Sequence, residues 1–232
     1  MNLFADALGW LADPANWTGP GSIPVRLGQH LAVTAVVVLL AALIAVPAGV
    51  LIGHTRRGAG VVGAVTGALR AVPTLGLLTL FGLALGIGLT APVLALIILA
   101  VPSLLAGSYS GVLAVDRSVA LAAKAIGMSA PQVIATVELP LALPLIVGGL
   151  RAATLQVVAT ATLAAYISDT GLGRYLFAGL KSRDYPQMLG GALLVIAVAV
   201  VLELVLAGCQ RLAVRVADPA GRTRISTVGP LT

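Results

Sequence analysis

The sequence predicts an all-α integral membrane protein with five transmembrane helices, and three observations lead to this fold class. Of the 232 residues, 59% are apolar and only 9% are charged, whereas a soluble domain carries roughly 25% charged residues. The mean hydropathy is +1.07. The 44 residues from Val72 to Val115 contain no Asp, Glu, Lys or Arg. Because so few polar groups remain to form a wetted surface, lipid must be the solvent for much of the chain.

The spans follow from the uncharged stretches, since a helix needs about 20 residues to cross the hydrocarbon. Leu27 to Gly53 is free of charge apart from the titratable His30, and the stretch from Val72 to Val115 is too long for one crossing. Its natural break is Gly82 to Pro92, where glycines and a proline cluster. The predicted spans are 27–53, 61–82, 91–114, 139–167 and 188–209. They form one domain over 27–209, between an extracytoplasmic segment 1–26 and a basic cytoplasmic tail 210–232.

The distribution of Lys and Arg predicts the orientation, because cytoplasmic loops are enriched in these residues. One side would carry Arg56, Arg57, Arg117, Lys124, Arg211, Arg215, Arg222 and Arg224, and the other Arg26, Arg174, Lys181 and Arg183. The eight cations on the first side, against four on the other, predict that the first side is cytoplasmic. The N-terminus is then outside and the C-terminus inside. The topology explains much of the net charge of +6, so no nucleic-acid partner is expected. The single Cys209 excludes an internal disulfide.

One polar, helix-breaking stretch, LAAKAIGMSAPQVIATVELPLALP, lies between the third and fourth predicted spans. Its first part favours a helix, which Gly127 can end in a left-handed conformation. Ser129 then begins a second short helix, with Gln132 completing a capping box and Pro131 tolerated in the first turn. Two compact helices that protrude into the cytoplasm suit docking of a partner better than catalysis.

The spacing of this stretch resembles a motif of the permease subunits of ATP-binding-cassette importers. That motif reads E-A-A, three residues, G, nine residues, then I-x-L-P. Here Ala122 and Ala123 precede Gly127 by the same interval, and Val137 to Pro140 complete the pattern; the one departure is Leu121, where the family has Glu. The resemblance implies a type I importer fold and a coupling segment, about 117–140, that contacts an ATPase. The implied contact residues are Leu121, Ala122, Ala123, Lys124, Gly127, Met128, Val137, Leu139 and Pro140.

A closer resemblance, to the glycine betaine, choline and carnitine permeases, extends over nearly all spans. Its stretches are AVPTLGLL, SYSGVLAVDRS, GMSAPQVIATVELPLALPLIVGGLRAAT and ATATLAAYISDTGLGRYLFAGL. It implies osmoprotectant import across a bacterial cytoplasmic membrane. The implied partners are two ATPase subunits that bind ATP and magnesium, a second permease chain, identical or different, and an extracytoplasmic substrate-binding protein. Methionine permeases share the five-span plan and the motif, so a small-amino-acid importer stays open as an alternative.

The chain has no G-x-x-x-x-G-K-[ST] phosphate loop, so we expect no ATP hydrolysis, no catalytic residue and no cofactor or metal in it. Aromatic residues make up only 4%, and high-affinity recognition of a quaternary ammonium is therefore expected in the separate binding protein. Hydroxyl side chains of the spans are candidates for a neutral polar translocation path, or else bond their own helices. These are Thr74, Ser108, Tyr109, Ser110, Thr160 and Thr162.

Two other classes of membrane protein remain as alternatives. A membrane enzyme would need convergent nucleophilic or acid–base side chains, which the cytoplasmic segments lack. A gradient-driven secondary transporter would need a driving-ion site, often within repeated halves, and no internal repeat is found. Arg151 and Glu203 are charges within spans; because each lies near a cytoplasmic end, we expect them to snorkel or to pair with each other in a structural role.

Overall fold

The computed structural model describes residues 2–217. Over that range helices joined by short turns form all of the regular secondary structure, without strands. The elements that precede the coupling segment are α1 (Leu3–Ala12), η1 (Pro14–Trp17), α2 (Ile23–Thr55), α3 (Ala59–Ala71), α4 (Thr74–Leu85) and α5 (Thr90–Leu113). The elements from the coupling segment onward are α6 (Arg117–Ala125), α7 (Ala130–Val133), η2 (Ile134–Glu138), α8 (Leu139–Ala161), η3 (Thr162–Tyr166), α9 (Gly173–Ser182) and α10 (Tyr185–Ala217). The predicted all-α membrane fold is confirmed.

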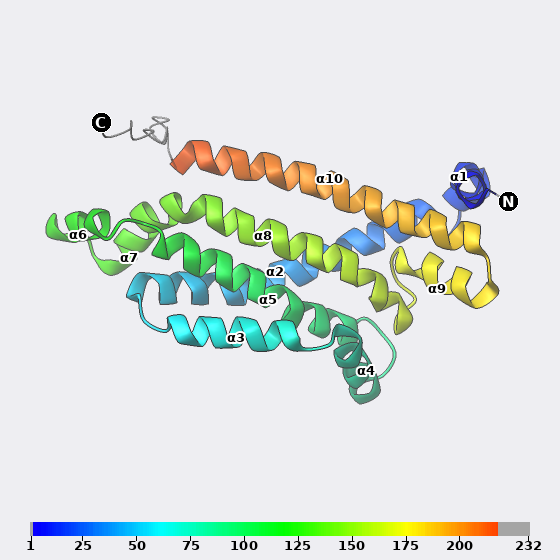
Figure 1. Ribbon diagram of the computed structural model, residues 1–232, viewed down its shortest axis with the longest axis horizontal. Coiled ribbons are helices and arrows are strands. Elements are labelled where there is room, and N and C mark those ends of the chain that lie inside the picture. The colour runs from blue at the N-terminus through cyan, green and yellow to red at the C-terminus, as the bar shows by residue number, and fades with distance from the viewer. Residues whose placement is uncertain (1, 218–232) are drawn as a thin grey trace, which may run out of the picture.

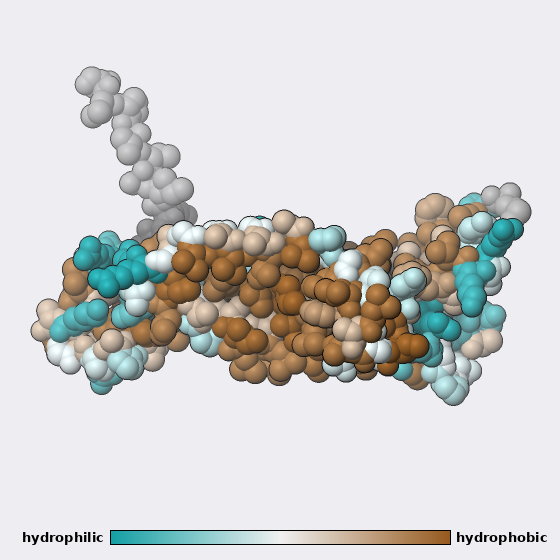
Figure 2. All heavy atoms as spheres, turned by 90° about the horizontal axis from the view of Figure 1, so that it is seen from below, coloured by the Kyte–Doolittle hydropathy of each residue, from teal (hydrophilic) through white to brown (hydrophobic). Residues whose placement is uncertain are grey.

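The long helices α2, α5, α8 and α10 lie along one axis of the molecule, with short helices at both ends (Figure 1). α1 and α9 form one end, and α6 and α7 form the other, where α10 also finishes. On the face that Figure 2 shows, an apolar belt covers the middle, while hydrophilic side chains gather at both ends. Backbone in lipid must satisfy its own hydrogen bonds, which helices do. The belt is therefore the surface that faces the hydrocarbon.

The second predicted span is not one straight helix, and the prediction of a single crossing helix over 61–82 was wrong in this respect. α3 and α4 meet at a break and differ in direction by 78°. The cause is Pro73, which lacks a backbone N–H and disfavours helical backbone at the residue before it. Val72 accordingly has extended backbone, with φ −69° and ψ 124°. Within residues 2–217, four helices and, taken as one span, this bent pair are long and apolar enough to cross a membrane.

Three other boundaries differ from the predicted ones. The fourth span belongs to a continuous helical run from Ala130 to Tyr166, which includes α7 and η2. α10 continues beyond Cys209 to Ala217, whereas residues 218–232 of the predicted tail lie outside the described part of the chain. The N-terminal segment contains α1, whose Trp10 and Leu11 pack in a cluster with Val195 of α10. Sequence reasoning missed this helix.

α5 lies at the centre of the bundle and contacts α2 and α8 through small residues. A Cβ atom added at Gly49 of α2 would meet the α5 backbone at 2.9 Å, and one added at Gly107 of α5 would lie 2.7 Å from the Cα of Gly149 in α8. By contrast, Gly63 and Gly67 have nothing within 4 Å at this position. Since lipid offers helices no hydrophobic drive to associate, such close backbone packing holds the core together.

Candidate functional site

The coupling segment begins with α6, and local hydrogen bonds define its start. The Asp116 carboxylate accepts a hydrogen bond from the backbone N–H of Ser118 at 2.8 Å. This N–H, together with the Ser118 hydroxyl, holds the pKa of the Asp116 carboxyl below its ordinary value. The carboxylate is thus ionised at neutral pH, and it satisfies one of the free N–H groups of the first turn. Asp116 is therefore the N-cap residue of α6.

The predicted left-handed turn at Gly127 is confirmed, while the coupling role of the segment stays a prediction. Gly127 has φ +94°, a left-handed conformation that glycine adopts without a steric penalty. Its N–H donates to the Lys124 carbonyl, and the N–H of Met128 donates to the Ala123 carbonyl at 3.2 Å. These two bonds close the end of α6 and turn the chain sharply towards α7.

The second short helix also starts as predicted. The Ser129 backbone N–H donates to Oε1 of Gln132 at 2.7 Å, which is one half of the capping box, and Pro131 lies in the first turn. The chain then passes through a π turn, η2, into α8 without a break. π turns inside α-helices are frequent at functional sites. α7 is therefore the first turn of the fourth span rather than a separate helix.

The structure places the predicted contact residues at different depths. Leu121 is 53% exposed, and the exposed side of the segment also includes Ala122, Lys124 and Gly127. Ala123 is buried against its own chain. Met128, Val137, Leu139 and Pro140 are half-buried. The surface open to a partner is thus formed mainly by α6 and the Gly127 turn.

A buried side-chain contact that sequence reasoning missed ties the segment to α2. Nδ1 of His54, near the C-terminal end of α2, lies 2.7 Å from Oε2 of Glu138 in η2. Both side chains are almost completely buried, at 12% and 7% exposure. The two residues are 84 positions apart, and His54 stands without a local cluster of possible ligands in the sequence, so no spacing rule points to the pair.

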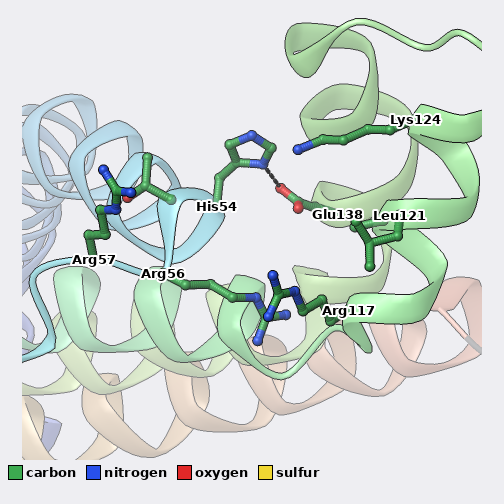
Figure 3. A pocket seen from close by; sticks show the side chains of 9 residues that line it. His54, Arg56, Arg57, Arg117, Leu121, Lys124 and Glu138 are labelled. Carbon is green, nitrogen blue, oxygen red and sulfur yellow. Dashed lines mark hydrogen bonds and ion pairs between the residues drawn. The ribbon is translucent and has the colours of Figure 1, made fainter.

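A cavity of about 450 Å³ opens beside His54 and Glu138, between the end of α2 and α6. Four cations line it, two from the α2–α3 turn and two from α6, and Lys124 points towards His54 and Glu138 (Figure 3). Leu121 also lines the cavity. The cationic residues are Arg56, Arg57, Arg117 and Lys124. We call this space the basic cavity.

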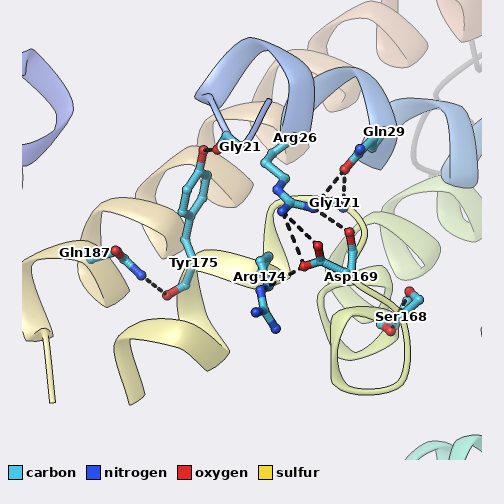
Figure 4. A network of polar contacts seen from close by, with 10 residues as sticks. Gly21, Arg26, Gln29, Ser168, Asp169, Gly171, Arg174, Tyr175 and Gln187 are labelled. Atoms are coloured by element: carbon cyan, nitrogen blue, oxygen red, sulfur yellow. Dashed lines mark hydrogen bonds and ion pairs between the residues drawn. The ribbon is translucent and has the colours of Figure 1, made fainter. Parts of the chain in front are cut away.

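At the opposite end, polar contacts join the start of α2 to the segment before α9 (Figure 4). The Arg26 guanidinium pairs with the Asp169 carboxylate at 3.3 Å, and Nε of Arg174 reaches the same carboxylate at 2.9 Å. The Gln29 side chain accepts from the Gly171 N–H at 3.1 Å, and the Tyr175 hydroxyl donates to the Gly21 carbonyl at 2.7 Å. α9 is thereby fixed to α2.

Two aromatic side chains meet at the same end. The rings of Tyr166 and Phe177 lie with centroids 5.6 Å apart, tilted by 51°. They line an open hollow of about 780 Å³ together with the cations Arg174 and Lys181. Few aromatic residues occur in the chain, yet two of them come together here.

The hydroxyls predicted to line a path bond their own helices in several cases. Ser108 is fully buried and its hydroxyl donates to the Leu104 carbonyl at 2.8 Å. The hydroxyls of Thr160 and Thr162 donate likewise, each to a carbonyl one turn earlier. Thr74 and Tyr109 are half-buried and Ser110 is exposed. A path along these six residues stays a prediction.

The predicted pairing of the two charges within the spans is confirmed. Nε of Arg151 donates to Glu203 at 2.7 Å, and a second guanidinium nitrogen contacts the other carboxylate oxygen. Nη1 of Arg151 also donates to Gln210 at 3.0 Å, and Gln210 in turn donates to the Pro144 carbonyl. This network links α8 to α10. Over residues 2–217, no group of three His, Cys, Asp or Glu side chains could hold a metal ion.

The chain is similar in sequence to membrane components of transport systems. Residues 45–216 match the family described as "Binding-protein-dependent transport system inner membrane component". The choline transport system permease protein OpuBB of Bacillus subtilis is 34% identical over 208 residues, covering 90% of this chain and 94% of the relative. The glycine betaine/carnitine/choline transport system permease protein OpuCB of the same organism is 34% identical over 194 residues, covering 84% and 89%.

A solved structure gives the same fold. The MetNI methionine ABC transporter in an inward-facing conformation contains a chain that superposes with a TM-score of 0.73. The match covers 87% of this chain and 99% of that chain, at 21% sequence identity. An identity this low carries the fold alone, and the type I importer permease architecture expected from the sequence is thereby confirmed.

Proposed function

The chain belongs to the binding-protein-dependent transport system inner membrane component family, and we propose that it is the permease subunit of an ATP-driven importer of quaternary ammonium solutes. The sequence relatives are named for choline, glycine betaine and carnitine transport. The observation that carries the proposal is this similarity over most of both chains. Chemistry on ATP is assigned to a separate subunit, and this chain supplies the route through the membrane.

In the proposed assembly, two permease chains pair and each offers its coupling segment to one ATPase subunit. The α6 end is then cytoplasmic and the α9 end external. Among the described residues, Arg56, Arg57, Arg117, Lys124, Arg211 and Arg215 belong to the cytoplasmic side and Arg26, Arg174, Lys181 and Arg183 to the external side. This excess of cations supports the orientation, since cytoplasmic loops collect Lys and Arg.

The ATPase subunits transmit their cycle through the surface formed by α6 and the Gly127 turn. Because η2 continues into α8 and Glu138 is paired with His54 of α2, a displacement of the coupling segment reaches two spans at once. The bent pair of α3 and α4 supplies a place where a span can change shape. Together these contacts support alternation between inward-open and outward-open states.

The external end supports a quaternary ammonium solute. A trimethylammonium group is attracted to the face of an aromatic ring, and Tyr166 and Phe177 offer such faces in one hollow. Lys181 beside them suits the carboxylate of a betaine. The solute is received there from an extracytoplasmic binding protein, which provides the high affinity.

Uptake measurements test the proposal. The chain is expressed with its ATPase and binding protein in a bacterial host without osmoprotectant transporters, and entry of radiolabelled glycine betaine is followed. We expect uptake that excess choline or carnitine competes with and excess methionine does not. An ATPase whose phosphate-loop lysine is replaced is the matched control and should abolish uptake. Uptake that persists after ATP is exhausted, while the ion gradient is kept, would instead identify a gradient-driven carrier.

A further inference from the structure

Within residues 2–217, cations outnumber carboxylates at the basic cavity. Four cations line it and one carboxylate, that of Glu138, whose Oε2 lies 2.7 Å from Nδ1 of His54. The nearby Asp116 carboxylate interacts with Arg56 and offsets part of the positive charge. In the part of the chain that the structure describes, none of the four cations forms a salt bridge. The cavity therefore has an excess of positive charge.

One of the four cations is held in place by a hydrogen bond, and two others lie on one helix. A guanidinium nitrogen of Arg56 donates to the Val115 carbonyl at 2.6 Å, which fixes this side chain between α2 and α6. Arg117 is the first residue of α6, and Lys124 lies two turns later on the same helix and points into the cavity (Figure 3). Like charges that face one space repel each other, and an anion that enters relieves the repulsion.

The position of the cavity indicates the source of this anion. Two lining residues, Leu121 and Lys124, belong to the coupling segment, and the surface at this end is hydrophilic beyond the apolar belt (Figure 2). A volume of about 450 Å³ accommodates a side chain of a docked protein. Resting on the proposed function, we infer that the basic cavity binds an acidic side chain of the ATPase subunit when that subunit docks on α6.

Leu121 fits this inference. It occupies the position at which the resembling permeases carry Glu, and in this chain it lines the cavity without adding a charge. A Glu at this position would supply a carboxylate from the chain itself and neutralise part of the excess. The substitution leaves the cavity open for the partner's carboxylate.

The test measures the affinity of the purified chain, in mild detergent, for the ATPase subunit that copurifies with it. Lys124→Glu turns an attraction for the partner carboxylate into a repulsion, and Leu121→Glu places a second carboxylate beside it, so each should weaken binding about tenfold at low salt. The difference from the unaltered chain should shrink near 1 M salt, where charges are screened within about 3 Å. Leu121→Gln controls for the lost apolar side chain, and Arg183→Glu, at an exposed cation of the opposite end, controls for a charge reversal; both should bind normally.

A second measurement identifies the carboxylate. Each acidic residue on the docking surface of the ATPase is replaced in turn by Lys. One of these replacements, and only one, should restore binding of the Lys124→Glu chain.

Three results would overturn the inference. If both Glu variants bind the ATPase as the unaltered chain does, the cavity takes no partner carboxylate, while the proposed function stands. If those variants keep the ATPase but lose copurifying phosphatidylglycerol, the cavity is a lipid headgroup site. If the unaltered chain binds no ATPase at any salt concentration, the proposed function itself fails. Size-exclusion profiles that match the unaltered chain establish that each variant is folded.

Discussion

Gly107→Ala should destabilise the bundle although alanine is the better helix former. At this position α5 and α8 cross with their backbones in contact. The new Cβ would lie 2.7 Å from the Cα of Gly149 and 2.9 Å from the Leu145 carbonyl oxygen. Both are backbone atoms of α8, so no side chain can rotate away, and the two helices must separate.

The magnitude follows from two opposing effects. Overpacking a tight contact costs about 1–3 kcal/mol, and replacing glycine by alanine inside a helix returns roughly 0.5–1 kcal/mol. We therefore expect a net loss of up to about 2.5 kcal/mol. Gly63→Ala in α3 is the matched control, because a Cβ there meets nothing within 4 Å; it should be neutral or stabilising by up to about 1 kcal/mol.

Thermal unfolding of the purified chains in one detergent, at one scan rate, compares the two variants. Gly107→Ala should unfold below the unaltered chain, and Gly63→Ala at or above it. Gly149→Ala, whose Cβ would lie 2.8 Å from the Ser103 carbonyl oxygen, should resemble Gly107→Ala. The close-crossing argument is refuted if Gly107→Ala unfolds at or above the temperature of Gly63→Ala.

Three further predictions concern the polar contacts and the turn. Glu203→Gln leaves Arg151 without a carboxylate and should lower the yield of folded chain, while the ratio of glycine betaine to choline uptake stays the same; a changed ratio at normal yield would contradict the structural role. Gly127→Ala puts a Cβ on left-handed backbone at φ +94°, a cost of about 1–2 kcal/mol, and should reduce ATPase retention more than thermal stability; normal retention would argue against the turn as a docking element. His54→Gln and Glu138→Gln should each lower the number of solute molecules moved per ATP in proteoliposomes, since the link between α2 and the coupling segment is weakened; an unchanged ratio in both variants would remove that link from the mechanism.

Much of the fold could be predicted because membrane spans and helix ends leave local signals. The uncharged stretches locate α2 and α5, and the α6 turn follows from Gly127, Ser129 and Gln132. The bend before α4 also has a local signal, because Pro73 restricts the backbone of Val72. The prediction of one span over 61–82 followed the apolar character of this stretch instead. A charge count and a span length say nothing about where a helix changes direction.

The contacts that define the candidate site have no such signal. His54 meets Glu138 across 84 positions, and Arg26 meets Asp169 across 143. Only the packing of α2 against α5 and α8 brings these residues together, and that packing depends on glycines whose roles the sequence does not distinguish. The pairing of Arg151 with Glu203 was foreseen because charges in lipid seek a partner and few were available.

The helical run from Ala130 to Tyr166 has the mechanical properties of a lever. Its 37 residues extend about 55 Å at 1.5 Å per residue, without a break along the way. A tilt of only about 5° at the cytoplasmic end moves the far end by roughly 5 Å over that length. The far end carries Tyr166 and the loop that Arg26 anchors through Asp169. In the proposed transport cycle, a small displacement at α7 would thus become a larger one at the end that carries Tyr166.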